Sequence, residues 1–182
     1  ANKKIIYLEG NHDFHLENTF QLFIEKNNLN SELFEYKKNE FNLTIENQIF
    51  LFCHGDIVDY KNESFKKWKN IYSSEPFKFL VNKILPFTLI KNLGEKASKD
   101  SKKRNSKEFS YEKAKALYRE GAEYILNLNQ IDYLIAGHTH IQDVYEFGDR
   151  QYLNNGFPKR DRKFIHIKNG KPSLISLEGS FE

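Results

Sequence analysis

The sequence predicts an α/β fold, because three short apolar segments alternate along the chain with segments of helical periodicity. The apolar segments cover residues 3–8, 49–53 and 131–136, and polar residues with a glycine follow each of them. Apolar residues recur at helical spacing between these segments. Strands separated by helical segments are typical of α/β proteins.

The length and composition of the chain favour one globular domain over residues 1–182. This length is sufficient to bury a core without disulfides, and the 39% of hydrophobic residues argues against disorder. The single cysteine, Cys53, excludes an internal disulfide and favours a reducing compartment; we expect it to be a small buried strand residue. The net charge of +3 is too small to indicate a nucleic-acid binder. No apolar run approaches the ~20 residues of a membrane span.

The first third of the chain predicts strands and one helix. Residues 3–8 are expected to form a short buried strand, and residues 16–28 a helix, because apolar side chains recur there at helical spacing. Alternating apolar residues within 41–45 predict another strand. A turn at Asn47 then leads into the strand 49–53.

The middle of the chain predicts a helical and basic insert, residues 64–107. Residues 64–93 carry apolar side chains at helical spacing, and Pro76 and Pro86 must start or kink these helices. Residues 91–107 are rich in serine and lysine, and seven basic residues against two acidic ones give a local charge of +5. The insert fits either a helical cap with a solvated edge or an acyl-chain groove bordered by cations.

The last third predicts one long helix followed by strands. Residues 111–128 have an apolar side at helical spacing, and residues 131–136 are expected to form a buried strand. The remainder contains four strand-like segments separated by turn residues, which predict antiparallel pairing: DVYEF, RQYLNN, KFIHI and PSLISL.

Ligand-type side chains follow all three apolar strands. The polar segments are residues 11–13 (Asn-His-Asp), 54–56 (His-Gly-Asp) and 138–140 (His-Thr-His). In α/β sheets, sites gather beyond the carboxyl ends of strands. Imidazole, amide and carboxylate together suit Mn, Fe or Zn rather than Ca. A glycine beside each ligand lets the backbone approach a small ion closely. The three segments together therefore predict a metal site.

In this order, the sequences GNHD, HGD and GHTH resemble the third, fourth and fifth motifs of the calcineurin-like metallophosphoesterase superfamily. The resemblance spans about residues 5–145 and implies a four-layer α/β/β/α sandwich. Two earlier motifs, Asp-x-His and Gly-Asp-x-x-Asp, normally precede GNHD. The chain begins at Ala1 and contains no methionine. We expect the bridging aspartate and the rest of the second ion's ligands to come from residues before Ala1, with this chain the C-terminal part of a longer protein.

The resemblance implies two divalent ions, with Mn favoured over Fe or Zn. Asn11, His54 and His138 would ligate one ion, and His140 would ligate the other. Two such ions ~3.5–4 Å apart clamp phosphoryl oxygens and lower the pKa of a water that then attacks phosphorus.

The other polar residues of these motifs take different roles under the same resemblance. His12 would stabilise the transition state or protonate the leaving oxygen, and Asp13 would hold the ring of His12 in the required tautomer. Asp56 is expected to support the site rather than bind a metal. His15 and His166 lie outside the motifs and are expected to be structural or surface residues.

The insert resembles that of the UDP-2,3-diacylglucosamine diphosphatase family of the lipid A pathway. The resemblance implies hydrolysis of a UDP-linked glycolipid to UMP and diacylglucosamine 1-phosphate, in the cytoplasm at the inner-membrane surface. Its candidate substrate contacts are Lys102, Arg104, Asn105 and Lys107. In one respect the chain departs from that family, which usually has arginine at the position of His12.

Two alternatives to this function stay open. The first is another phosphatase or phosphodiesterase of the same superfamily, acting on nucleotides, phosphoproteins or nucleic acid, although nucleic acid is not favoured. The second is a non-catalytic scaffold that retains the fold for protein binding.

Overall fold

A computed structural model describes residues 3–11, 16–63, 67, 70–71, 74–84, 92 and 110–177 of the chain. The chain divides into two compact units. The first comprises Ala1–Tyr60 with Lys115–Glu182, and the second comprises Lys61–Ala114. The bounds of the second unit enclose the insert that the sequence predicts at residues 64–107.

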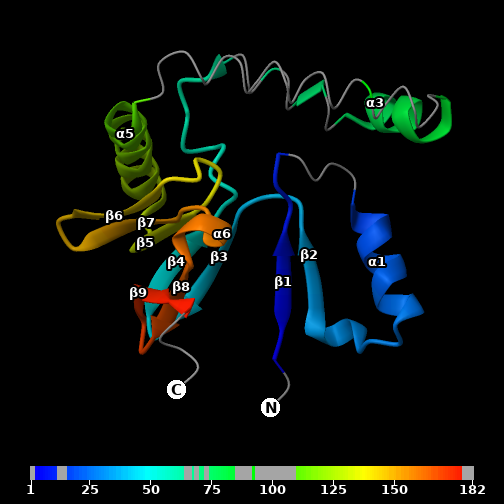
Figure 1. Cartoon of the computed structure of the whole chain (residues 1–182), viewed down its shortest axis with the longest axis horizontal. Coiled ribbons are helices and arrows are strands. Elements are labelled where there is room, and N and C mark those ends of the chain that lie inside the picture. Colours follow the sequence, from blue (N-terminus) through cyan, green and yellow to red (C-terminus); the bar gives the residue numbers. More distant parts are fainter. Residues whose placement is uncertain are drawn as a thin grey trace. The chain divides into compact units, whose positions relative to one another are not determined.

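The first unit contains a five-stranded sheet with the strand order β3-β4-β5-β7-β6 (Figure 1). Its strands are β3 (Phe41–Ile45), β4 (Gln48–Phe52), β5 (Tyr133–Ala136), β6 (Gln142–Phe147) and β7 (Arg150–Asn155). The three inner strands run parallel, whereas β3 and β6 pair antiparallel at the edges. The sheet is therefore mixed, and the predicted α/β class is confirmed.

The long helix α5 (Tyr111–Asn129) supplies one side of the hydrophobic core. Its buried residues Ala122 and Leu126 share a cluster with side chains from β4, β5 and β7, such as Leu134 and Tyr152. A side chain reaches from the sheet to the end of this helix: the Arg150 guanidinium donates to the carbonyl of Leu126 at 2.9 Å. This packing places α5 against β4 and β5, the strands that the predicted histidine ligands follow.

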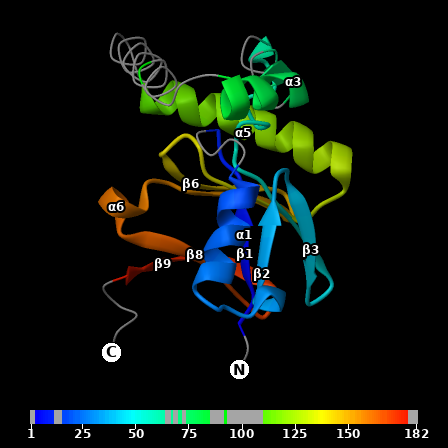
Figure 2. The same ribbon diagram turned by 90° about the vertical axis from the view of Figure 1, so that its right-hand side faces the viewer.

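A second, two-stranded sheet joins β1 (Ile5–Leu8) to β2 (Phe34–Lys37) in parallel. Helix α1 (Glu17–Lys26) and a 3₁₀ turn, Ser31–Leu33, make the crossover that parallel strands require. The ring of Phe20 from α1 lies 5.6 Å from that of Tyr7 and 5.5 Å from that of Tyr36. Aromatic packing therefore holds α1 against this pair of strands. Figure 2 shows the ribbon of α1 in front of β1.

The last described residues form a short helix, α6 (Pro158–Asp161), and an antiparallel hairpin. Strands β8 (Lys163–Lys168) and β9 (Lys171–Ser176) form this hairpin. Asn169 and Gly170 both have positive φ, 52° and 69°, as a tight two-residue turn requires. The predicted antiparallel strands of the last third are therefore confirmed.

In the second unit, helix α3 (Glu75–Phe79) continues into a π-helical turn, Leu80–Ile84. The helix begins at Glu75 with Pro76 in its first turn, and the hydroxyl of the N-cap residue Ser74 accepts a hydrogen bond from the Phe77 amide. The prediction that Pro76 starts or kinks a helix is thus confirmed, since Pro76 lies in the first turn of α3, whereas Pro86 lies outside the described residues. Within the described part of the chain, no helix has the length and apolar character needed to cross a membrane.

Candidate metal centre

The carboxyl ends of β4 and β5 run side by side into the predicted motifs. The amide of Cys53 donates to the carbonyl of Ile135, and the amide of Gly137 donates to the carbonyl of His54, both at 3.0 Å. Backbone hydrogen bonding therefore continues beyond the ends of both strands and brings the loop that starts at His54 beside the loop that contains His138.

Atoms that could bind a metal ion, from residues that follow three different strands, lie close together at His54. Its Nε2 atom lies 2.8 Å from Oδ1 of Asn11, which follows β1, and 2.9 Å from Nδ1 of His138, which follows β5. The two imidazole rings cross at 74° with their centroids 4.8 Å apart. The structure thus brings together three of the four residues that the sequence singled out as metal ligands.

A glycine makes this approach of the two loops sterically feasible. Gly55 has a φ of +116°, and a Cβ added there would lie 2.7 Å from the carbonyl oxygen of Gly137 and 2.9 Å from Cβ of His138. A side chain at this position would push the two histidines apart and would also strain the backbone.

Helix α5 packs against the same loop through a second close contact. A Cβ added at Gly121 would lie 1.9 Å from the carbonyl oxygen of Val58, a residue with no exposed surface. The amide of Val58 donates to the carbonyl of Gly55 at 3.1 Å, which closes the turn after His54. The absence of a side chain at Gly121 therefore lets α5 pack directly against the turn.

The environment of His138 favours the neutral imidazole. Burial, together with the neighbouring His54, lowers the pKa of His138 to about 4, although Asp56 opposes the shift. Burial also raises the pKa of the nearby Tyr118 hydroxyl, whose ring centroid lies 6.5 Å from that of His138. At neutral pH His138 therefore keeps a nitrogen lone pair, as a metal ligand must.

The chemistry and spacing of these atoms fit a divalent transition metal. Two imidazole nitrogens and one amide oxygen suit Mn, Fe or Zn. Metal–nitrogen bonds of ~2.0–2.1 Å place neighbouring donors on one ion roughly 3–3.4 Å apart, and the observed separations of 2.8 and 2.9 Å are close to this range. Among the described residues, no group of three or more His, Cys, Asp or Glu side chains is placed to hold a metal. The candidate centre therefore depends on the amide of Asn11 as its third donor.

His140 is turned toward a different neighbour. Its ring stacks on that of Phe157 with the centroids 5.0 Å apart and the planes at 27°. The residue is exposed, and its φ of +57° places it in the left-handed region. The assignment of His140 to a second metal ion stays a prediction.

Several predicted site residues lie outside the part of the chain that the structure describes. They are His12, Asp13, His15, Lys102, Arg104, Asn105 and Lys107. Of the remaining candidates, Cys53 is 5% exposed and belongs to the core, as expected. Asp56 is buried, and His166 lies half-buried on β8.

The sequence analysis did not predict that Asn154 supports the site. It lies at the carboxyl end of β7 and has no exposed surface. Its side-chain amide donates to the carbonyl of Gly137 at 2.6 Å and to the hydroxyl of Tyr152 at 3.0 Å. The sequence feature that could have indicated Asn154 is the one that indicated the ligands: polar residues at the end of a strand-like segment, here RQYLNN.

One family of known proteins matches most of the chain. The model of the calcineurin-like phosphoesterase family, Metallophos, matches residues 1–142. The protein is thus an α/β protein whose histidines lie together at the ends of parallel strands. The chain belongs to the calcineurin-like phosphoesterase family. Members of this family typically bind divalent metal ions.

Two solved structures are similar to the chain at low identity. One is a novel archaeal phosphodiesterase, with 13% identity, a TM-score of 0.43, and coverage of 94% of this chain and 68% of that chain. The other is Vps29 from Entamoeba histolytica, complexed with zinc, with 13% identity, a TM-score of 0.37, and coverage of 94% of this chain and 73% of that chain. No curated protein matches the chain significantly.

Proposed function

We propose that the protein is a divalent-metal-dependent phosphohydrolase whose metal centre includes Asn11, His54 and His138. The observation that carries this proposal is the meeting of the Asn11 amide oxygen with one nitrogen from each histidine. Residues from three separate strand ends supply these atoms, and membership of the calcineurin-like phosphoesterase family supports the same chemistry.

The remaining residues of the motifs complete the proposed site. His140 would bind a second ion, His12 would stabilise the transition state or protonate the leaving oxygen, and Asp13 would orient the ring of His12. Divalent ions, with Mn favoured over Fe or Zn, would polarise the phosphoryl oxygens and activate a water. The low pKa of His138 keeps it available as a ligand at neutral pH.

For the substrate, we propose the pyrophosphate of UDP-2,3-diacylglucosamine. Water would attack one phosphorus and break its bond to the bridging oxygen, which gives UMP and diacylglucosamine 1-phosphate. The second unit supports a lipid substrate, because Phe79, the last residue of α3, and Ile84, the last residue of the π-helical turn, are 61% and 59% exposed. The basic segment, residues 91–107, would hold the phosphates through Lys102, Arg104, Asn105 and Lys107. Such an enzyme would act in the cytoplasm at the inner-membrane surface.

Metal analysis tests the first part of this proposal. The protein is purified with Mn²⁺, and bound metal and hydrolysis of bis(p-nitrophenyl) phosphate are measured before and after EDTA treatment. We expect stoichiometric metal and an activity that EDTA abolishes and Mn²⁺ restores. Protein that holds no metal and cleaves no phosphoester would contradict the proposal and favour a non-catalytic scaffold.

A substrate comparison tests the second part. Release of UMP from UDP-2,3-diacylglucosamine in detergent is compared with hydrolysis of nucleotides, a phosphopeptide and bis(p-nitrophenyl) phosphate. We expect the glycolipid to have the highest kcat/KM. A preference for a soluble phosphoester, unaffected by lipid or detergent, would contradict the glycolipid substrate and leave the metal-dependent phosphohydrolase in place.

A further inference from the structure

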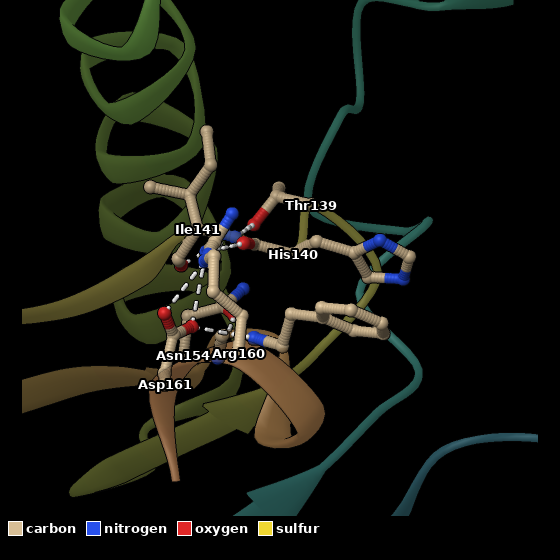
Figure 3. A network of polar contacts seen from close by, with 8 residues as sticks. Thr139, His140, Ile141, Asn154, Arg160 and Asp161 are labelled. Atoms are coloured by element: carbon tan, nitrogen blue, oxygen red, sulfur yellow. Dashed lines mark hydrogen bonds and ion pairs between the residues drawn. The ribbon is translucent and has the colours of Figure 1, made fainter. Parts of the chain in front are cut away.

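The turn formed by residues 156–161, here called the α6 turn, contacts the backbone and the ring of His140. Figure 3 shows Arg160 and Asp161 of this turn beside the loop that carries Thr139, His140 and Ile141. The two segments are 20 residues apart, and the Arg160 guanidinium donates to the carbonyl of His140 at 2.7 Å. The α6 turn therefore holds the backbone of a residue that we place in the metal centre.

The same turn also holds the imidazole. The stacking of Phe157 on His140, with 27° between the planes, fixes the plane of the imidazole ring. Stacking uses the faces of the ring and leaves its two nitrogens at the edge. Among the described residues, neither nitrogen of His140 has a hydrogen-bond partner. The ring is therefore oriented by apolar contact while its donor atoms remain available.

Internal hydrogen bonds keep Phe157 and Arg160 in place. The Asp161 carboxylate accepts from the amide of Phe157 at 2.8 Å and from Nε of Arg160 at 2.7 Å. The Arg160 guanidinium and the Phe157 amide hold the pKa of the Asp161 carboxyl below its usual value. The carboxylate thus orders both residues that contact His140.

Asn154 connects the α6 turn to the loop of the histidines at a second point. Its side-chain oxygen accepts from the amide of Gly156 at 3.0 Å, while its amide group donates to the carbonyl of Gly137. The loop that carries His138 and His140 is therefore tied to the α6 turn at both Gly137 and His140.

We propose that Phe157 and Arg160 are positioning residues for His140: they hold its ring and backbone so that a ring nitrogen is presented to a divalent cation. This inference rests on the proposed function. Outer partners of metal ligands act in this way because a ligand that is already oriented loses less entropy when it binds.

Titration calorimetry with MnCl₂ and with ZnCl₂ tests this inference, on the metal-free forms of the protein and of its variants. Phe157→Ala should weaken metal binding by about 10–100-fold at one site. Phe157→Tyr, which keeps the stack, should restore affinity, whereas Phe157→Leu, which is apolar but not aromatic, should not. Arg160→Ala should also weaken binding. Lys159→Ala, an exposed change on the same turn, serves as the matched control and should leave affinity unchanged.

A double-mutant cycle separates positioning from a general loss of stability. If Phe157 acts through His140, Phe157→Ala should weaken metal binding in the wild-type background and have no further effect in His140→Ala. Thermal unfolding of each metal-free variant, followed by circular dichroism, establishes that the variants compared are folded. Equal effects of Phe157→Ala in both backgrounds would overturn the inference.

The outcomes also separate this inference from the proposed function. If the wild-type protein binds neither Mn²⁺ nor Zn²⁺, the proposed function fails. If the wild type binds metal and His54→Ala removes it, but neither His140→Ala nor Phe157→Ala weakens binding at any site, only the positioning role is overturned.

Discussion

The Nε2 atom of His54 lies 2.9 Å from the Nδ1 atom of His138, although 84 positions separate the two residues in the sequence. The contact exists because β4 and β5 are adjacent and parallel, so that both residues leave the sheet at the same edge. Asn11 reaches the same point from β1, with its oxygen 2.8 Å from the His54 nitrogen.

Removal of either histidine should abolish tight metal binding. We expect His54→Ala and His138→Ala each to weaken Mn²⁺ binding by at least about 100-fold, since even partners outside the ligand set contribute about 10–100-fold. Calorimetry and metal analysis of the dialysed protein measure this. His166→Ala on β8 is the matched control. Normal metal content in His54→Ala would contradict the assignment of the centre.

Bound metal should stabilise the folded protein. A ligand that binds only the native state at 100 times its dissociation constant adds about 2.7 kcal/mol to the free energy of unfolding. Urea unfolding with and without Mn²⁺ should show a stabilisation of about this size in the wild type. The stabilisation should be absent in His138→Ala, and an equal effect in both proteins would point to binding elsewhere.

Gly121→Ala should destabilise the protein, contrary to the usual effect of this change in a helix. Alanine normally stabilises a helix by about 1 kcal/mol relative to glycine. Here the added Cβ would lie 1.9 Å from the carbonyl oxygen of Val58, so the helix and the turn after His54 must separate.

We expect Gly121→Ala to cost about 1–3 kcal/mol in urea unfolding and also to weaken metal binding. Glu123→Ala, an exposed change on the same helix, should stay within about 0.5 kcal/mol of the wild type. An unchanged or higher stability of Gly121→Ala would show that α5 does not press on the turn.

The ion pair between Arg119 and Asp143 should contribute to stability rather than to metal binding. Asp143 on β6 is 7% exposed and accepts two hydrogen bonds from the guanidinium of Arg119 on α5, at 2.8 and 2.7 Å. Asp143→Asn removes the charge and one acceptor. Because the Arg119 side chain is 31% exposed and partly solvated, we expect a loss of about 1–3 kcal/mol.

Urea unfolding measures this loss, with the exposed Glu146→Gln on the same strand as control. The Mn²⁺ affinity of folded Asp143→Asn should equal that of the wild type. A large loss of affinity at unchanged stability would instead couple this ion pair to the metal centre.

Asn154→Asp should disturb both stability and metal binding. The substitution replaces the amide donor by a carboxylate oxygen that faces the Gly137 carbonyl from 2.6 Å. The loss of a buried hydrogen bond with an unsatisfied acceptor costs about 1–3 kcal/mol, and the loop that carries His138 should shift. Unfolding and calorimetry measure the two effects. Asn42→Asp, the same change at an exposed position on β3, should alter neither.

Local patterns in the sequence predicted most elements of the first unit. The helix at 17–26, the strands around Asn47 and the antiparallel tail follow from apolar spacing and turn residues. Strand β2 was not predicted, because Phe34–Lys37 mixes polar and apolar residues without a clear alternation. It forms a strand because it pairs with β1, to which the crossover through α1 connects it. This pairing is a tertiary contact.

For the candidate centre, the sequence indicated the chemical types of the ligands but not their partners. Polar residues after apolar strands identified Asn11, His54 and His138. Asn154 was not predicted, although it also lies at the end of a strand. A single sequence does not show which strand-end amide contacts the loop that carries His138. The orientation of His140 could not be predicted either, since Phe157 reaches it only through the fold.

The sequence alone determined where strands end and which donor groups follow them, because hydrophobic periodicity and residue chemistry are local properties. Only the tertiary structure decided which donors meet. Strand order, the two close approaches at Gly55 and Gly121 and the stacking of Phe157 on His140 each depend on contacts between distant segments. Whether donor atoms come within 3 Å of one another is set by the packing of backbones, which residue types alone do not specify.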